Sequence, residues 1–117
     1  MRRVEKPWGH ELIWAETDRY VAKILCIRRG QRLSRQYHKV KDETLYVEEG
    51  AMVLELGEGD SLEIREMGRG DAYRVVPGTI HRMIATEDVR VFEVSTPELD
   101  DVVRLEDEYG REGTSEA

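Results

Sequence analysis

The sequence is poor in cysteine, in aromatic residues and in long apolar runs. Its one cysteine, Cys26, excludes a disulfide framework within the chain. No apolar run approaches the roughly 20 residues that a membrane-spanning helix needs, and the opening residues, MRRVEKPWGHE, lack the apolar core of a signal peptide. A chain of 117 residues has the size of one domain. We therefore expect a single domain over residues 1–117, located in the cytoplasm.

Basic residues are outnumbered, with 18 Lys and Arg against 25 Asp and Glu and a net charge of −7. This balance disfavours nucleic-acid and anionic-membrane partners. Residues 28–41 are an exception, because they contain no acidic residue and six basic ones: Arg28, Arg29, Arg32, Arg35, Lys39 and Lys41. This run is either a solvated face of edge strands or a local positive field for a small anion such as a sugar phosphate.

Short segments rich in apolar and β-branched residues recur at roughly ten-residue spacing, separated by glycine-rich turns, which is typical of a β-sandwich or barrel. We expect an all-β fold with a core over about residues 12–95. The predicted strands are 12–15, 20–27, 44–48, 51–56, 62–66, 72–76, 80–85 and 89–95.

The pattern changes after Ser95. Thr96 suits a helix N-cap, Pro97 the first helical position and Glu98 the first turn. These residues predict a short C-terminal helix over 97–104, within a helix and tail that span 96–117.

The stretch from Gly30 to Gly50 contains His38, with Gln36 two residues before it and Glu43 five after it. Side chains two apart on a strand share a face, so Gln36 and His38 should point the same way, together with Arg32 and Ser34. Glu43 follows a short connection, at the start of the next strand.

A second glycine-bounded turn, Gly78-Thr79, delivers His81 to the start of another strand. Imidazole, carboxylate and amide groups together suit a divalent ion such as Zn, Mn, Fe, Co or Ni. The absence of thiolates disfavours a closed structural zinc site. The sequence therefore predicts a metal site that brings His38 and His81 together.

The spacing of these residues resembles the two cupin motifs. The first, G-x5-H-x-H-x4-E-x6-G, is matched from Gly30 to Gly50, with Gln36 at the position of the first histidine. The second, G-x5-P-x-G-x2-H-x3-N, is matched at Gly70, Gly78 and His81, with Val76 and Ala85 at the proline and asparagine positions. This resemblance implies a double-stranded β-helix, or jelly-roll barrel.

A closer resemblance extends over about residues 5–111. The segments KPWGHE, RLSRQYH, PGTIHR and DDVVRLEDEYGR are together similar to the cupin domain of type II mannose-6-phosphate isomerases. That domain commonly follows a mannose-1-phosphate guanylyltransferase domain, which is not found in these residues, so we do not expect guanylyl transfer. The resemblance implies a metal-dependent aldose–ketose isomerase whose metal ligands are Gln36, His38, Glu43 and His81.

The chain departs from that family between the metal ligands. The family usually reads H-H-H-R-x-E-H, whereas residues 38–44 read HKVKDET. The expected ligand positions His38 and Glu43 are kept, and the additional histidines and the arginine are missing.

Converting mannose 6-phosphate to fructose 6-phosphate moves a proton between C2 and C1 through an enediol. A metal ion would stabilise charge on the sugar oxygens. The base is Glu43, a hydroxide on the ion, or Lys23, which is either an inward cation or an edge residue with its ammonium in solvent. Arg32, Lys23, Arg104 and Arg111 are candidate phosphate anchors. The expected catalytic residues are thus Glu43, Lys23 and Arg32.

Two other functions stay open. One is a non-catalytic sugar-binding or regulatory metal cupin, which the missing histidines favour. The other is a cupin oxygenase, which needs a redox-active metal and an apolar pocket. We expect a small-molecule partner, a phosphorylated hexose, no nucleic acid and no membrane, and, from the cupin resemblance, a homodimer.

Overall fold

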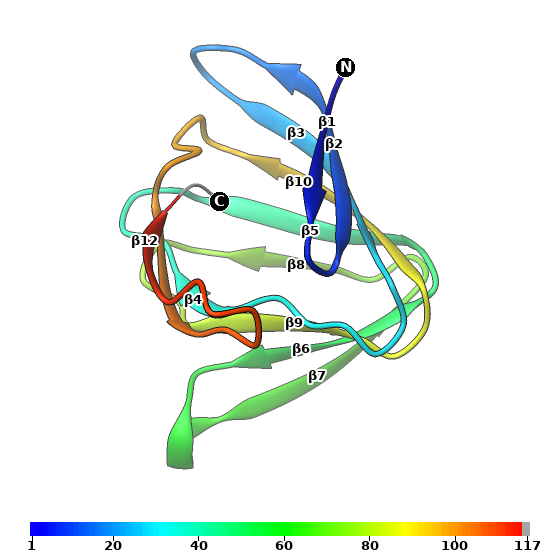
Figure 1. Ribbon diagram of the computed structural model, residues 1–117, viewed down its shortest axis with the longest axis vertical. Helices are drawn as coiled ribbons and strands as arrows, with labels where there is room; N and C mark the ends of the chain where they lie inside the picture. Colours follow the sequence, from blue (N-terminus) through cyan, green and yellow to red (C-terminus); the bar gives the residue numbers. More distant parts are fainter. Residues whose placement is uncertain (116–117) are drawn as a thin grey trace.

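The computed structural model describes residues 1–115, whose strands form two six-stranded antiparallel sheets packed face to face (Figure 1). The first sheet has the order β1-β2-β3-β10-β5-β8 and the second the order β12-β11-β4-β9-β6-β7. The all-β prediction is confirmed. The strands are β1 (Arg2–Lys6), β2 (Gly9–Glu16), β3 (Val21–Ile27), β4 (Arg35–Tyr37), β5 (Glu43–Glu49), β6 (Ala51–Leu56), β7 (Glu63–Gly68), β8 (Ala72–Val75), β9 (His81–Ala85), β10 (Val89–Ser95), β11 (Val102–Glu106) and β12 (Gly113–Ser115).

Strand alternation builds the core between the two sheets. In β5, Leu45 and Val47 are fully buried, whereas Tyr46 between them is 42% exposed. Opposed residues on paired strands share a face, so Leu25 of β3, Val91 of β10 and Val47 of β5 form one inward row across the first sheet. The second sheet contributes Met52 and Leu54 of β6 and Met83 of β9 to the same hydrophobic core.

The predicted C-terminal helix is wrong. Thr96 to Asp101 form only turns, in which the Leu99 amide bonds the Pro97 carbonyl at 2.8 Å and the Asp101 amide bonds the Glu98 carbonyl at 3.3 Å. The chain then becomes strand β11, with Val102 buried and Val103 half-buried in the alternation of a strand. Strand β11 pairs with β4, so the need to cover the edge of β4 outweighs the helix-capping signal.

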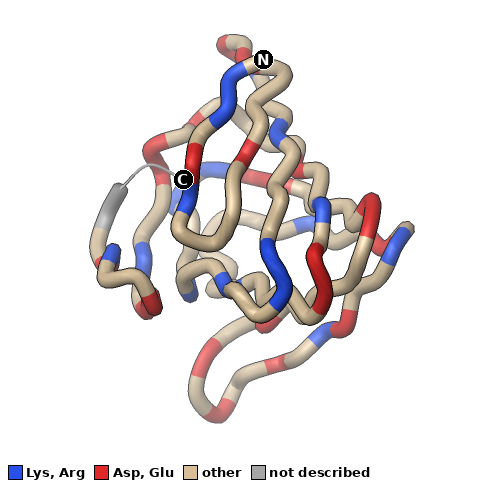
Figure 2. The backbone as a smooth tube through the Cα atoms, turned by 45° about the vertical axis from the view of Figure 1, so that its right-hand side comes forward, with Lys and Arg blue, Asp and Glu red and all other residues tan. Residues whose placement is uncertain are grey.

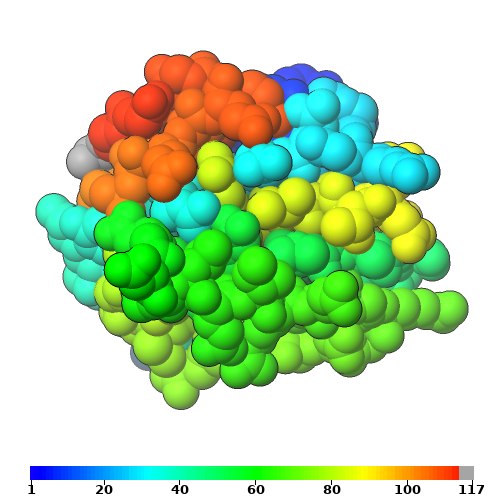
Figure 3. All heavy atoms as spheres, turned by 90° about the horizontal axis from the view of Figure 1, so that it is seen from below, coloured from blue at the N-terminus to red at the C-terminus, as the bar shows by residue number. Residues whose placement is uncertain are grey.

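Both ends of the chain add strands outside the expected core of residues 12–95. Strand β1 pairs with β2 at one edge of the first sheet, and β12 pairs with β11 at one edge of the second (Figure 1). Figure 3 shows the C-terminal segment, in orange, lying directly beside the cyan segment around residues 28–37. The last two residues of the expected tail, 116–117, lie outside the described residues.

Gly50, which ends the first motif, is required by close packing. Its φ is +85°, and a Cβ at this position would lie 2.0 Å from the carbonyl oxygen of Asp88. Only glycine fits, because the turn between β5 and β6 packs directly against the turn before β10.

Within residues 1–115 the helical structure is a single three-residue 3-10 turn, Gly59–Ser61, which is far too short to cross a membrane.

Candidate metal centre

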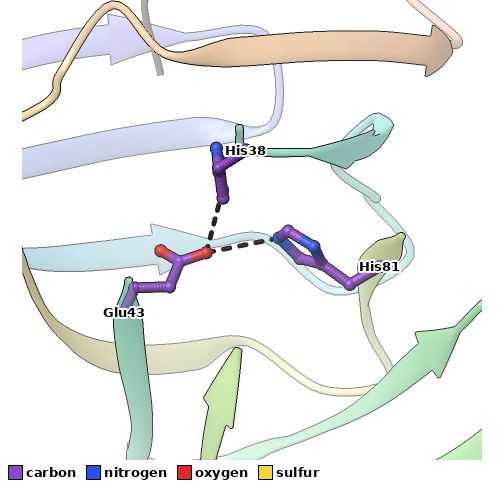
Figure 4. Close-up of side chains that lie close together, drawn as sticks. All are labelled: His38, Glu43 and His81. Carbon is purple, nitrogen blue, oxygen red and sulfur yellow. Dashed lines mark hydrogen bonds and ion pairs between the residues drawn. The ribbon is translucent and has the colours of Figure 1, made fainter. Parts of the chain in front are cut away.

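Three side chains from three separate places in the sheets meet at one point inside the sandwich. His38 follows β4, Glu43 begins β5 and His81 begins β9. Figure 4 shows both imidazole rings turned toward the same carboxylate oxygen of Glu43. The His38 Nε2 lies 3.0 Å and the His81 Nε2 3.3 Å from Glu43 Oε1. All three residues are at most 3% exposed, so the cluster is closed off from bulk solvent.

The far nitrogen of each ring is fixed by a backbone carbonyl. The Nδ1 of His38 lies 2.6 Å from the Asp101 carbonyl oxygen, and that of His81 lies 2.9 Å from the Thr79 carbonyl oxygen. A carbonyl oxygen can only accept, so both Nδ1 atoms carry the proton and donate. In the neutral ring each Nε2 then presents a lone pair to Glu43, which is the orientation that metal-binding histidines adopt.

Two lone pairs facing a carboxylate repel it unless a proton or a cation lies between them. The remaining oxygen, Glu43 Oε2, is buried and has no hydrogen-bond partner. The separations of 3.0 and 3.3 Å between the nitrogens and Oε1 match neighbouring ligands around an ion with bonds of about 2.1 Å. The His38, Glu43 and His81 donors therefore fit a divalent cation.

The charge on Glu43 is maintained by its neighbours. Burial alone would raise the pKa of this carboxyl, but the hydrogen bonds that it accepts from His38 and His81 when a proton, rather than a cation, lies between ring and carboxylate, together with the positive charge of Lys41, outweigh burial and hold the pKa well below its ordinary value. Glu43 is therefore an anion, as a metal ligand must be.

Gln36 is placed in the same interior by strand register. On β4 it lies directly opposite His81 of β9 and Arg104 of β11. Opposed residues point to the same side of a sheet, so these three side chains form a row across the second sheet. Gln36 lines the same small cavity as His38, Glu43 and His81, and Ser34 lines it as well. We call this space, of about 40 Å³, the inner cavity.

A second pair of buried charges lies beside the cluster. Lys41, only 1% exposed, places its Nζ 3.6 Å from Glu43 Oε2 and 3.2 Å from Glu93 Oε2. Burial and the negative charge of Glu43 raise the pKa of Glu93. Burial would lower the pKa of Lys41, but the two carboxylates outweigh burial and raise it. The lysine thus holds the two carboxyl groups together.

The sequence interpretation missed Glu93 as a site residue. The signal is its position in the strand: Val89, Val91 and Ser95 are buried and alternate with exposed or half-buried residues on β10, and Glu93 occupies the same inward series. An acidic residue in the apolar series of a strand indicates an interior polar site, because burying a charge without partners is costly.

Of the expected catalytic and anchoring residues, Lys23 is an inward cation that is 1% exposed. It lines the inner cavity together with Arg104 and Arg111. Arg32 is not brought there. Its Nε pairs with Glu108 Oε1 at 2.8 Å, and its side chain is 38% exposed. Strand β4 begins only at Arg35, so the alternation that was expected to align Arg32 with His38 does not extend back to it.

The basic run of residues 28–41 does not form one positive face. The Arg28 guanidinium donates to the Pro7 carbonyl, Arg35 pairs with Glu55 and Glu106, and Lys41 is buried. Figure 2 shows basic and acidic positions distributed over the same strands. Both alternatives considered for this run, a single solvated face and a single anion field, are therefore replaced by separate local contacts, some with carboxylates and one with a backbone carbonyl.

The cupin domain family matches residues 23–95 of this chain, which is more than half of it. The chain is a cupin. Two curated cupin-containing relatives are similar over 94% of the chain. They are the mannose-1-phosphate guanylyltransferase of Escherichia coli K12, at 31% identity, and that of Salmonella typhimurium LT2, at 30%. The chain spans only 23% of the length of each relative.

Solved structures support the same assignment. KdgF from Halomonas sp. is 29% identical with a TM-score of 0.74, and the similarity covers 83% of this cupin and 86% of KdgF. CapF from Staphylococcus aureus has a TM-score of 0.75 over 90% of this cupin and 34% of CapF. The identity to CapF is only 16%, so that likeness concerns the fold alone.

Proposed function

We propose that this cupin is a metal-dependent sugar-phosphate isomerase that interconverts mannose 6-phosphate and fructose 6-phosphate. The observation that carries the proposal is the convergence of the His38 and His81 Nε2 atoms on one Glu43 oxygen. The similarity to the mannose-1-phosphate guanylyltransferases supports a mannose phosphate as the substrate.

The proposed ligands are Gln36, His38, Glu43 and His81, and the ion is one of Zn, Mn, Fe, Co or Ni. When bound, such an ion supplies a Lewis acid for the negative charge that develops on the sugar O1 and O2 atoms. The residues hold their own donors in place beforehand, because the Asp101 and Thr79 carbonyls fix the orientation of the two rings.

The charge of the inner cavity supports an anionic substrate. Its walls carry five cationic side chains, Lys6, Lys23, Lys41, Arg104 and Arg111, against three carboxyl groups, Glu11, Glu43 and Glu93. A buried excess of positive charge favours a ligand that neutralises it. Lys23, Arg104 and Arg111 remain the proposed anchors for the phosphate, and Arg32 is withdrawn because it pairs with Glu108 outside the cavity.

The proton that moves between C2 and C1 needs a carrier beside the sugar. Glu43 and Lys23 both line the inner cavity, and Glu93 is a further carboxyl in its wall. We propose that one of these three groups carries the proton. Replacing Glu93 by Gln and measuring kcat together with metal affinity separates proton transfer from metal binding, because only a proton carrier loses kcat with the metal retained.

Elemental analysis of the purified protein, followed by a coupled assay for fructose 6-phosphate, tests the whole proposal. We expect about one divalent ion per chain and turnover that is lost on chelation and restored by the ion. Turnover that survives complete metal removal would falsify the scheme.

A sugar-binding protein without turnover is the second candidate function. It is favoured by the sequence His38-Lys39-Val40-Lys41, in which the additional histidines of the isomerase family are missing, and by the pairing of Lys41 with Glu43 and Glu93. Tight binding of mannose 6-phosphate without product formation would identify this function. An oxygenase is less well supported, because eight charged side chains line the inner cavity beside only four apolar ones, Trp8, Leu25, Leu33 and Met83.

We further propose a homodimer, the state expected from the cupin resemblance. Light scattering coupled to gel filtration should give twice the chain mass of 13.6 kDa. The mass of one chain would overturn this proposal without affecting the metal centre.

A further inference from the structure

A second, larger cavity adjoins the inner one. It has a volume of about 770 Å³ and lies between the first three strands of the first sheet and the segment of residues 97–103. We call it the outer cavity. Its volume is within the range of roughly 300–1,000 Å³ that is common for small-molecule sites.

The inner cavity is too small for a sugar. Its volume of about 40 Å³ holds only about three water molecules, at roughly 10–15 Å³ each by the same measure. A hexose phosphate that touches the metal centre must therefore leave most of its atoms in the outer cavity.

Three side chains form the junction between the two spaces. Among the described residues, only Lys6, Glu11 and Lys23 line both cavities. Glu11 Oε1 lies 3.5 Å from the Lys23 Nζ and 4.0 Å from the Lys6 Nζ. The three side chains are at most 13% exposed. A ligand that extends from the outer cavity to the metal centre has to contact this junction.

The junction has the chemistry that a sugar requires. A hydroxyl group both donates and accepts a hydrogen bond, and a carboxylate between two ammonium groups offers an acceptor and donors side by side. Burial lowers the pKa of Lys6, the positive charges of Lys23, Arg111 and Arg104 lower it further, and Glu11 acts in the opposite direction. Five cationic side chains against three carboxyl groups line the inner cavity beside this junction, which favours a ligand that also carries negative charge.

We propose that Lys6, Glu11 and Lys23 form a subsite for a polyhydroxylated anion, a sugar phosphate or sugar acid, that lies mainly in the outer cavity and reaches the metal centre with one end. This assignment rests on the proposed function for the presence of a ligand at the metal centre. It adds the residues that select the ligand and the path along which the ligand lies.

Calorimetric titration of the protein, loaded with the divalent ion that it binds most tightly, tests the subsite. The probes are mannose 6-phosphate, gluconate and uncharged mannose. We expect Glu11→Gln and Lys6→Gln each to weaken binding of the tighter anionic probe at least tenfold, while the affinity for the ion stays within twofold. The unchanged ion affinity shows that the variants fold, and Lys6→Arg should restore part of the binding.

Matched controls come from strand β1. Arg3 and Glu5 form an exposed pair at 3.1 Å, away from both cavities. Arg3→Gln and Glu5→Gln remove the same charges as the two test variants, and they should leave probe binding unchanged. The ratio of the affinities for mannose 6-phosphate and gluconate then distinguishes a phosphate from a carboxylate ligand.

The subsite is overturned if Glu11→Gln and Lys6→Gln bind like the wild type, if the wild type binds none of the probes, or if uncharged mannose binds as tightly as the anions. Failure of the isomerase proposal is separate. Binding that depends on Glu11 and Lys6 without product formation removes isomerase activity and keeps the subsite, whereas turnover that is unaffected in both variants keeps the isomerase and removes the subsite.

Discussion

The two ends of the sandwich interior are built from the same strands and are equally buried, but the inward side chains are charged or polar at one end and apolar at the other. At one end the inward residues of β3, β5, β9 and β10 are Lys23, Glu43, His81 and Glu93. Two and four residues away in the same inward series, after the charged residue on β3, β5 and β9 and before it on β10, they are Leu25, Ile27, Leu45, Val47, Met83, Ala85, Val91 and Val89. We call these regions the charged end and the apolar end.

The apolar end provides stability, because each large side chain removed from water contributes roughly 1.5–3 kcal/mol. The charged end opposes folding, because several charged side chains lose their hydration there and this free-energy cost is offset only by their attraction to one another. A stack of further apolar residues would be at least as stable. The charged end is therefore best understood as a functional site that the apolar end supports.

Removing the Lys41 ammonium, which pairs with two carboxyl groups of the charged end, should have the largest effect on stability. Lys41→Met leaves Glu43 and Glu93 without the ammonium that lies 3.6 and 3.2 Å from them. We expect the free energy of unfolding of the metal-free protein to fall by about 3–5 kcal/mol in urea denaturation. Lys39→Met, at an exposed neighbouring position, should change it by less than about 0.5 kcal/mol. A loss of under about 1 kcal/mol for Lys41→Met would show that the charged end does not depend on this ammonium for its stability.

At the apolar end, Leu54→Ala should lower the free energy of unfolding by about 3 kcal/mol, because it leaves a cavity at a position with 0% exposure. Affinity for the metal ion should not change, as Leu54 does not line the inner cavity. Leu62→Ala, at a position that is 37% exposed, is the matched control and should be close to neutral. A parallel loss of ion affinity in Leu54→Ala would mean that the ends are coupled.

The histidines of the charged end should affect binding more than stability. His81→Ala removes one of the three converging donors, and we expect ion affinity to fall at least about 100-fold, or about 2.7 kcal/mol. The measurement is competition with a chelator of known affinity. His10→Ala removes the one histidine outside the cluster and should leave ion affinity unchanged. Equal effects of the two variants would contradict the proposed centre.

The smallest effect on stability and on ion affinity is expected at the loop between β4 and β5, which carries His38. The Asp101 carboxylate accepts hydrogen bonds from the backbone amides of Lys39, Val40 and Lys41, with N–O distances of 3.0, 2.7 and 2.8 Å. Asp101→Ala should cost about 1–2 kcal/mol of unfolding free energy and weaken ion binding about tenfold, because the loop that carries His38 loosens. Asp100→Ala serves as the control. Wild-type ion affinity in Asp101→Ala would show that the charged end orders itself without this loop.

Much of the fold follows from local sequence. The predicted strands 20–27, 51–56 and 89–95 agree with β3, β6 and β10 to within one residue, because these segments are dense in apolar and β-branched residues and are bounded by turns. Strands β1 and β11 were missed. Each has a mixed composition and becomes a strand only by pairing with an edge, β1 with β2 and β11 with β4.

The site was only partly predictable for the same reason. Gln36, His38, Glu43 and His81 stand at recognisable motif spacings, and the structure brings all four to one cavity. Lys41, Glu93 and Glu11 belong to no motif. Their roles depend on strands from distant parts of the chain, such as the pairing that sets Glu93 opposite Lys23.

The sequence by itself determined the alternation of its strands, the glycine turns between them and the chemistry of the motif donors, since these properties depend on residues a few positions apart. Only the tertiary structure decided which charges share the interior, that Arg32 faces outward to Glu108, and that Lys6, Glu11 and Lys23 separate two cavities. The physical reason is that strand alternation is a local property, whereas pairing and register are set by contacts between distant segments.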